Sequence, residues 1–167
     1  MQDKPLNVLF LCTHNSARSI LAEAVLTASG RGRFRGFSAG SSPRANQKPN
    51  PLALQVLNEA VIPTAGLTSK SWDEFARPGA PHMDLIITVC DNAAGEVCPV
   101  WPGHPATAHW GYPDPSDVQG SEQERHDAFK RTMHDIKRRI DLLINLPADK
   151  LAKLALQASA RNLSQPK

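Results

Sequence analysis

Cys12 and Arg18 stand six positions apart, between an apolar run and an amphipathic run, and together they could attack and hold a tetrahedral oxyanion. In a turn between a parallel strand and a helix, backbone N–H groups converge on an anion and the helix dipole adds positive charge. A cysteine there should be partly thiolate at neutral pH and therefore nucleophilic. Arg18 can grip the oxyanion with two N–H bonds, and Ser19 can hydrogen-bond the thiolate. The backbone that would form the cradle belongs to Thr13, His14, Asn15, Ser16, Ala17 and Arg18.

A plainer interpretation makes Cys12 the buried end of a core strand and Arg18 an exposed helix residue. A cysteine and an arginine at this spacing form a weak signal when they occur alone. Here they follow a strand-like segment, precede a helix-like one and are joined by Ser19. In an open α/β sheet this is the edge at which ligands bind, so we favour the catalytic interpretation.

Cys90 and Cys98 complete a set of three cysteines, and an odd number argues against a static disulfide framework. Cys90 follows the apolar run 84–89, so it should lie at the same sheet edge as Cys12. Seven polar and small residues separate it from Cys98 and could form a marginal helix that unwinds. Both cysteines could instead be apolar fillers. Zinc binding with His104 or His109 is a further alternative, although the spacing matches no common zinc site.

Strand-like and helix-like segments alternate along the chain, which predicts an α/β fold with a parallel sheet. Gly30 should stop the first helix, and the spacings of Ser71 with Glu74 and of Ser121 with Glu124 predict capping boxes. Pro147 should break the last long helix. Strands are predicted at 7–11, 34–38, 84–89 and 107–110, and helices at 20–28, at 51–60, after Ser71 and over 121–143.

Length and composition predict one catalytic domain over residues 1–147, followed by a helical tail over residues 148–167. The 167 residues are 41% hydrophobic and carry a net charge of +3. The basic cluster at 130–139 alternates with apolar residues at helical spacing, so it predicts a solvated helix face and no nucleic-acid partner. No run approaches the roughly 20 apolar residues that span a bilayer, and no signal peptide is apparent. We therefore expect a cytoplasmic protein with no membrane partner.

The loop at 11–19 resembles the signature loop of low-molecular-weight protein tyrosine phosphatases and of the arsenate reductases built on the same fold. The similarity continues through 37–40, 88–90 and 109–115, and it covers roughly residues 7–146. The resemblance implies a three-layer sandwich with a central, mainly parallel four-stranded sheet. It also implies that Asp114, held between Pro113 and Pro115, donates a proton to the leaving oxygen. Asp117 is the local competitor for that role.

Both enzyme types attack with the loop thiolate and differ in the step that follows. A phosphatase hydrolyses a cysteinyl phosphate with water, whereas the resemblance to thioredoxin-coupled reductases implies a relay from Cys12 to Cys90 and Cys98. Thioredoxin would then reduce the disulfide, with glutaredoxin and glutathione as the alternative. Tyrosines that help phosphatases choose aryl substrates are missing after Asp114, where Ser116 and Asp117 follow. We therefore favour arsenate reduction over phosphomonoester hydrolysis, with a non-catalytic oxyanion or redox sensor as a third hypothesis.

Some relatives bind a potassium ion behind the loop, and Asn15, Glu23, Ser38 and Thr68 look similar to its ligands. Lys70 stands where an acidic ligand would be, and its ammonium group could replace the ion, so we expect neither a metal nor a cofactor. His14 stands where many loops of the family carry glycine. A bulky residue there would be awkward if its φ angle were positive.

Overall fold

The central strand β1 (Leu6–Cys12) is an apolar segment that becomes fully buried toward its carboxyl end. It pairs in parallel with β2 (Phe34–Gly40) on one side and with β3 (Leu85–Thr88) on the other, and β3 pairs in parallel with β4 (Thr107–His109). In the strand order β2-β1-β3-β4, the connection from β1 leads to β2 on one side, and the chain then returns to β3 on the other side of β1. The strand order therefore reverses at β1. Ligands bind beyond the carboxyl ends of strands at such a point. The computed structural model describes residues 5–90, 107–147 and 149–150.

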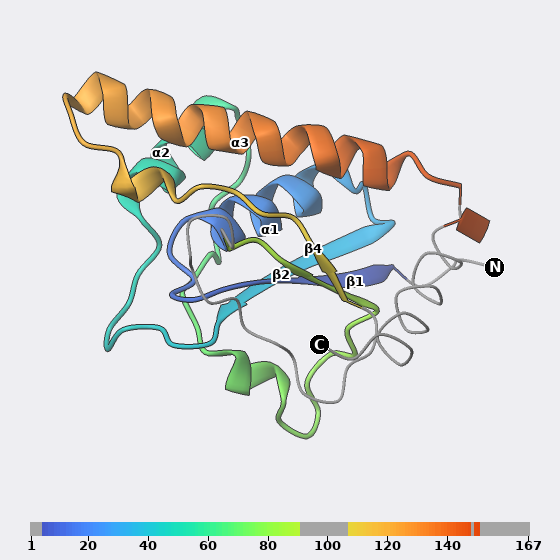
Figure 1. The fold of residues 1–167 in the computed structure, drawn as a ribbon. Coiled ribbons are helices and arrows are strands. Elements are labelled where there is room, and N and C mark those ends of the chain that lie inside the picture. The colour runs from blue at the N-terminus through green and yellow to red at the C-terminus, as the bar shows by residue number, and fades with distance from the viewer. Residues whose placement is uncertain (1–4, 91–106, 148, 151–167) are drawn as a thin grey trace.

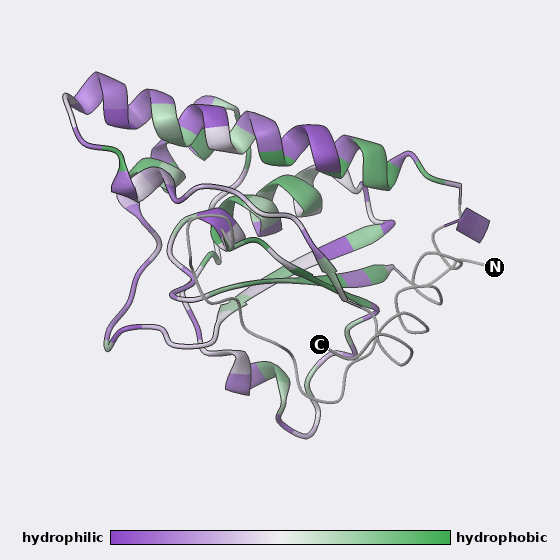
Figure 2. Cartoon of the chain, viewed as in Figure 1, coloured by the Kyte–Doolittle hydropathy of each residue, from purple (hydrophilic) through white to green (hydrophobic). Residues whose placement is uncertain are grey.

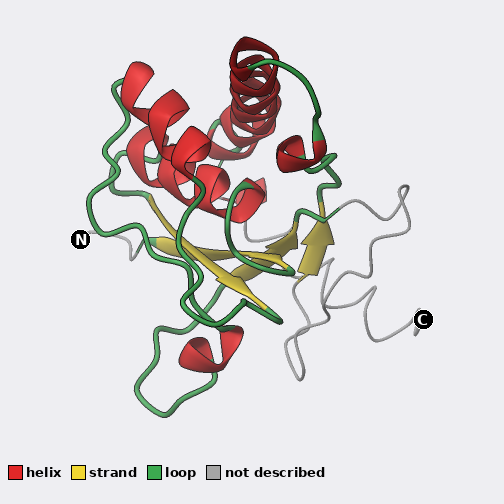
Figure 3. Ribbon diagram, turned by 90° about the vertical axis from the view of Figure 1, so that its left-hand side faces the viewer, coloured by secondary structure: helices red, strands yellow, loops and turns green. Residues whose placement is uncertain are grey.

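One face of this sheet is covered by the three α-helices of the described residues, α1 (Arg18–Ser29), α2 (Pro51–Glu59) and α3 (Glu122–Ile144) (Figures 1 and 3). The helix α1 contacts the strands directly, and α3 crosses over both α1 and α2. The opposite face carries the short 3-10 helix η1 (Trp72–Phe75), and a second one, η3 (Pro115–Asp117), contacts α3. The predicted α/β fold with a four-stranded parallel sheet is therefore confirmed.

The alternation of side chains along the strands divides the apolar residues between two cores. Val8, Phe10 and Cys12 of β1 face the helices, whereas Leu9 and Leu11 face η1. Figure 2 shows that the middle of the sheet and much of α1 are hydrophobic, whereas α3 is largely hydrophilic. The larger core is completed from α3 by residues at helical spacing, namely Phe129, Met133, Ile136, Ile140 and Leu143.

The two predicted capping boxes have different outcomes. At the start of α3 the Ser121 side chain accepts from the Glu124 N–H and the Glu124 side chain accepts from the Ser121 N–H, as predicted. At Ser71 the hydroxyl oxygen accepts from the Asp73 N–H at 3.1 Å, and the segment that follows is a 3-10 helix. The prediction of a capping box between Ser71 and Glu74 was therefore wrong, because the tighter helix places the N–H two residues on within reach of the cap.

Gly30 ends α1 as predicted, but space rather than a left-handed backbone requires glycine at this position. Its φ angle is −73°, in the right-handed region that any residue adopts. A Cβ atom there would lie 2.8 Å from both the Leu26 carbonyl oxygen and the Phe34 Cβ. The chain therefore turns from α1 into β2 through a gap that admits only a hydrogen.

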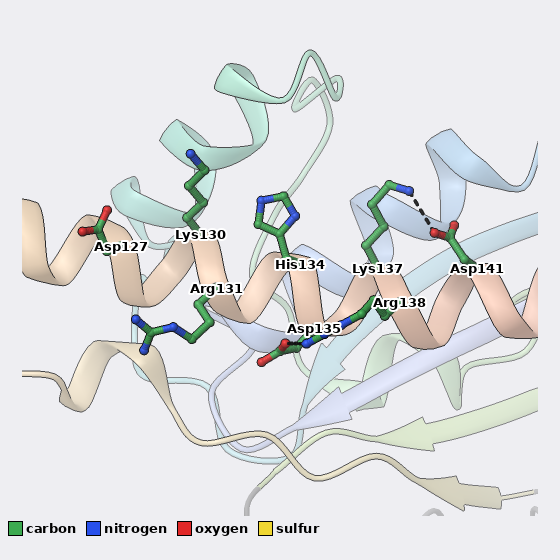
Figure 4. Close-up of a pocket in the computed structure, with 8 residues that line it drawn as sticks. All are labelled: Asp127, Lys130, Arg131, His134, Asp135, Lys137, Arg138 and Asp141. Atoms are coloured by element: carbon green, nitrogen blue, oxygen red, sulfur yellow. Dashed lines mark hydrogen bonds and ion pairs between the residues drawn. The ribbon is translucent and has the colours of Figure 1, made fainter.

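The outer face of α3 carries the basic cluster at 130–139, and its Lys and Arg side chains are exposed, as the sequence predicted. Figure 4 shows this face, where Lys130, Arg131 and His134 alternate with Asp127 and other carboxylates. Within the residues that the structure describes, no helix is long and apolar enough to cross a bilayer. Cys98, His104 and all of the predicted tail except Asp149 and Lys150 lie outside the described residues.

Candidate active site

The Cys12 thiol lies at the carboxyl end of β1, where two hydrogen-bond donors converge on its sulfur. The Asn15 N–H donates to Cys12 Sγ at 3.2 Å, and Ser19 Oγ lies 3.0 Å from the same sulfur. The Asn15 side-chain amide donates to Ser19 Oγ at 2.8 Å, and when Cys12 is a thiolate the Ser19 hydroxyl is the donor to the sulfur. Donors aimed at a sulfur favour its thiolate form. Cys12 is a free thiol and 3% exposed.

Asn15 organises the loop, because each of its polar groups is engaged. Its carbonyl oxygen accepts from Ser69 Oγ at 2.5 Å, and its Oδ1 atom accepts from the Lys70 N–H at 2.8 Å. Its φ angle is +57°, a left-handed conformation that asparagine tolerates better than most residues. The loop therefore takes its left-handed residue at Asn15 and avoids strain at His14, where the sequence had raised the question.

The start of α1 is built to face an anion. Its N-cap residue is Ala17, which makes no side-chain cap, and the first turn contains no acidic residue. The N–H groups of such an end are left for a ligand, and the helix dipole favours negative charge there. Gly40 of β2 packs against the loop so closely that a Cβ atom would lie 2.6 Å from the Thr13 carbonyl oxygen. The loop backbone is thus fixed from both sides.

Arg18 occupies the first turn of α1 and is 5% exposed. Its Nη1 donates to the Tyr112 carbonyl oxygen at 3.1 Å, and its Nη2 lies 3.5 Å from Asp114 Oδ2. Asp114 caps η3, and its Oδ1 atom accepts from the Ser116 N–H and hydroxyl at 2.9 and 2.7 Å. These bonds turn Oδ2 toward the guanidinium. Asp117, the competing carboxylate, is exposed in η3.

Tyr112 contributes its backbone to the site and its side chain to the core. The ring packs in the larger core under the Arg139 guanidinium, which lies 5.4 Å from the ring centroid. Burial raises the pKa of Tyr112 to about 12, so the phenol stays protonated at neutral pH. The tyrosine therefore anchors Arg18 and supplies no acid or base.

Cys90 follows β3 and is fully buried in a disulfide bond. The register pairs Leu11 with Thr88, and the Val89 N–H donates to the Leu11 carbonyl oxygen at 2.9 Å. Cys90 therefore stands about one residue beyond the position opposite Cys12, which corresponds to a Cα separation of roughly 6 Å in strand geometry. The two cysteines lie at neighbouring strand ends, as the sequence predicted. Cys98, the third cysteine, lies outside the described residues.

The expected cation ligands do come together, and the ammonium group of Lys70 lies among them. Lys70 Nζ donates to the carbonyl oxygens of Thr68 at 2.6 Å and of Ser38 at 3.2 Å, and it lies 3.9 Å from Glu23 Oε1. Ser38 Oγ donates to the same carboxylate at 2.5 Å. Burial raises the pKa of Glu23, whereas Ser38 and Lys70 lower it. A potassium ion does not fit beside an ammonium group that already uses these oxygens.

Sequence reasoning missed the partners that hold the loop from outside it. The Tyr112 carbonyl, the Lys70 N–H and the Ser69 hydroxyl all lie more than fifty positions from the residues they bind. Two of the three are backbone groups, which leave no residue-type signal. His109 was considered only as a zinc ligand, but among the described residues no group of three or more His, Cys, Asp or Glu side chains could hold a metal ion.

Comparisons with known proteins agree with this geometry. The family described as low molecular weight phosphotyrosine protein phosphatase matches residues 7–157. An arsenate reductase from Bacillus licheniformis is 36% identical over 134 residues, which cover 80% of this chain and 91% of that protein. The crystal structure of arsenate reductase from Archaeoglobus fulgidus superimposes with a TM-score of 0.63 at 26% identity, over 83% of this chain and 99% of the other. A thioredoxin-dependent arsenate reductase from Corynebacterium glutamicum has a TM-score of 0.53 at 25% identity, over 85% of this chain and 65% of the other. The chain therefore belongs to the low molecular weight phosphotyrosine protein phosphatase family, and its curated relatives there include arsenate reductases.

Proposed function

We propose that the chain reduces arsenate to arsenite, with Cys12 as nucleophile and Cys90 and Cys98 as the thiols that carry the oxidising equivalents away. The observation that carries this proposal is the state of the cysteines: Cys90 is disulfide-bonded while Cys12, at the neighbouring strand end, is a free thiol. A phosphatase has no need for a redox-active thiol at this edge. Similarity to arsenate reductases across most of the chain supports the same function.

In the first step the Cys12 thiolate attacks the arsenic atom, and a sulfur–arsenic bond forms as one arsenate oxygen leaves. The Asn15 N–H and the Ser19 hydroxyl stabilise the sulfur anion. Arg18 and the start of α1 neutralise the oxyanion. Asp114, whose Oδ2 faces Arg18, donates the proton that the leaving oxygen needs.

In the second step a Cys90 thiolate attacks the sulfur of Cys12. A Cys12–Cys90 disulfide forms, the sulfur–arsenic bond breaks, and arsenic keeps the electron pair, so As(V) becomes As(III) and leaves as arsenite. The Cα separation of roughly 6 Å falls within the range that a disulfide spans. The alternation of side chains along a strand puts Cys12 on the helix side of the sheet and position 90 on the opposite side. The backbone after Val89 must therefore turn to bring the Cys90 sulfur to Cys12.

In the third step Cys98 attacks Cys90, which forms a Cys90–Cys98 disulfide and returns Cys12 as a thiolate. An external dithiol then reduces the new disulfide. We propose thioredoxin for this reaction, on the strength of the thioredoxin-dependent relative from Corynebacterium glutamicum. A glutaredoxin with glutathione is the alternative donor, and a reducing cytoplasm would supply either one.

Counting thiols tests the relay. The reduced protein is incubated with arsenate without any external reductant, and free thiols are measured by alkylation and peptide mass spectrometry. We expect two of the three thiols to disappear and Cys90 to be found joined to Cys98. Phosphate release from p-nitrophenyl phosphate without thiol loss would instead support the phosphatase, and no response to either compound would leave a sensor.

Serine variants separate the steps. Cys12→Ser should abolish arsenate reduction and any phosphatase activity, because both begin with this sulfur. Cys90→Ser should abolish arsenate turnover and spare phosphate release. Cys98→Ser should stop after one turnover with thioredoxin, trapped as the Cys12–Cys90 disulfide. Normal turnover by Cys98→Ser with thioredoxin would show that the third step is wrong.

A further inference from the structure

His109 lies at the end of β4, beside the end of β3 that carries Cys90. The register pairs it with Thr88, so both side chains project from the same face of the sheet. That face is the one opposite the α-helices, because the residues that flank His109 and Thr88 in their strands, Ala108 and Ile87, pack in the larger core under the helices. Extended backbone continued for two residues past Thr88 would bring the Cys90 side chain to the face of His109.

The contacts of the imidazole are compatible with Nε2 as its basic nitrogen. Thr88 Oγ1 donates its one hydrogen to the Ala108 carbonyl oxygen at 3.4 Å, and it lies 2.8 Å from His109 Nδ1. Both contacts are hydrogen bonds at the same time only when Nδ1 donates to Oγ1, and in that tautomer the lone pair is on Nε2.

His109 Nε2 lies close to the backbone of Cys90. A Cβ atom built on Gly111 would lie 3.0 Å from His109 Nε2 and 3.4 Å from the Cys90 carbonyl oxygen. Both atoms therefore border the same backbone position, and glycine at 111 leaves room for the ring. His109 itself is exposed, so a proton taken up by Nε2 can pass to solvent.

We propose that His109, held by Thr88, accepts the proton of the Cys90 thiol and so generates the thiolate that attacks Cys12. This inference rests on the proposed relay. The proton passes from Cys90 Sγ to His109 Nε2, directly or through one water, and then to solvent. The Cys90 sulfur keeps the electron pair with which it forms the bond to Cys12.

Among the described residues, the neighbours of His109 on this face are uncharged. Near His109, β3 contributes Thr88, the segment after β3 contributes Cys90, and the segment after β4 contributes the Gly111 backbone. The side chains of Trp110 and Tyr112 pack against or within the core on the other face. Within the part of the chain that the structure describes, no ion pair joins the ring to a carboxylate, and its hydrogen-bond partner is Thr88.

The test compares His109→Gln with His134→Gln, a control at an exposed histidine of α3 (Figure 4). Fully reduced protein is mixed with arsenate, and thiol loss in a single turnover is followed from pH 6 to pH 9. An unassisted thiol with an ordinary pKa of about 8.5 is only about 3% ionised at pH 7, so His109→Gln should be slowed by up to roughly 30-fold there. The deficit should vanish toward pH 9, where thiols ionise without help. His134→Gln and the p-nitrophenyl phosphate activity of both variants should match the unmodified protein.

Two results would overturn the role of His109. One is a wild-type pH profile in His109→Gln; the other is a loss that is equal at every pH, which indicates that the residue only supports the fold. Thr88→Val, which keeps the imidazole but removes its anchor, should show a smaller loss with the same pH rescue. Cys90→Ser is measured in parallel: if it still reduces arsenate with loss of two thiols, the relay itself has failed. If Cys90→Ser loses arsenate turnover but His109→Gln keeps the wild-type pH profile, the relay stands and only the role of His109 as a base is rejected.

Discussion

Replacing Lys70 with methionine should remove the positive charge that lies among the oxygens behind the catalytic loop. Lys70 Nζ is 3.9 Å from Glu23 Oε1, and the two side chains are only 15% and 17% exposed. At an effective dielectric constant of about 20 this pair contributes roughly 4 kcal/mol of attraction. The desolvation of both groups offsets part of it, but Lys70→Met leaves Glu23 buried without its partner, which costs about 3–5 kcal/mol in typical buried pairs.

We therefore expect Lys70→Met to lower the free energy of unfolding by about 3 kcal/mol, or Tm by roughly 6–12 °C in a chain of this size. The deficit should depend on pH. The pKa of Glu23 is already raised by burial, and without Lys70 it rises further. A carboxyl group with a raised pKa in the folded state contributes stability at low pH that is lost as pH rises through the folded pKa. The stability lost in Lys70→Met should accordingly be small near pH 5 and reach its full size by pH 8.

Thermal unfolding of the variant at pH 5 and pH 8 measures both effects. Lys137→Met is the matched control, because Lys137 Nζ lies closer to its partner, 3.0 Å from Asp141 Oδ2, but both side chains are nearly half exposed (Figure 4). An exposed helix pair of this kind is worth about 0.3–0.5 kcal/mol. Burial as the source of the effect would be refuted if the two variants lost similar stability, or if the Lys70→Met deficit were the same at both pH values.

Two further predictions concern α2. Val61 follows this helix in a left-handed conformation with φ of +59°, and it is 88% exposed. Val61→Gly should therefore raise the free energy of unfolding by about 1 kcal/mol in chemical denaturation, because it relieves the backbone strain and removes almost no packing; a neutral or negative effect would show that the strain is not there. His126 Nε2 lies 2.6 Å from Glu59 Oε1 and joins α3 to α2, and this hydrogen bond raises the pKa of His126 and lowers that of Glu59. The contribution of His126 is complete below its unfolded pKa of about 6.5 and is lost as pH rises through the raised folded value. His126→Gln should therefore show a flatter dependence of Tm on pH between 6 and 8, and an unchanged slope would contradict the pairing.

The local elements of this protein follow from its sequence because their causes lie within a few residues. A short continuous apolar run predicts β1, one amphipathic stripe predicts α3, and the capping box between Ser121 and Glu124 joins positions three apart. Cys12 and Arg18 could be recognised for the same reason, since both belong to one strand–loop–helix segment. Their proximity to Cys90 also followed, because carboxyl ends of parallel strands share an edge.

Contacts between distant segments were decided only by the tertiary structure. Whether the left-handed residue of the loop is His14 or Asn15 depends on Ser69 and Lys70, which bind Asn15 from more than fifty positions away. The anchoring of Arg18 depends on the Tyr112 carbonyl, a group that every residue type carries. A single sequence records side-chain identity and short-range spacing, whereas these bonds depend on which backbone atoms the packed sheet and loops bring within hydrogen-bonding distance.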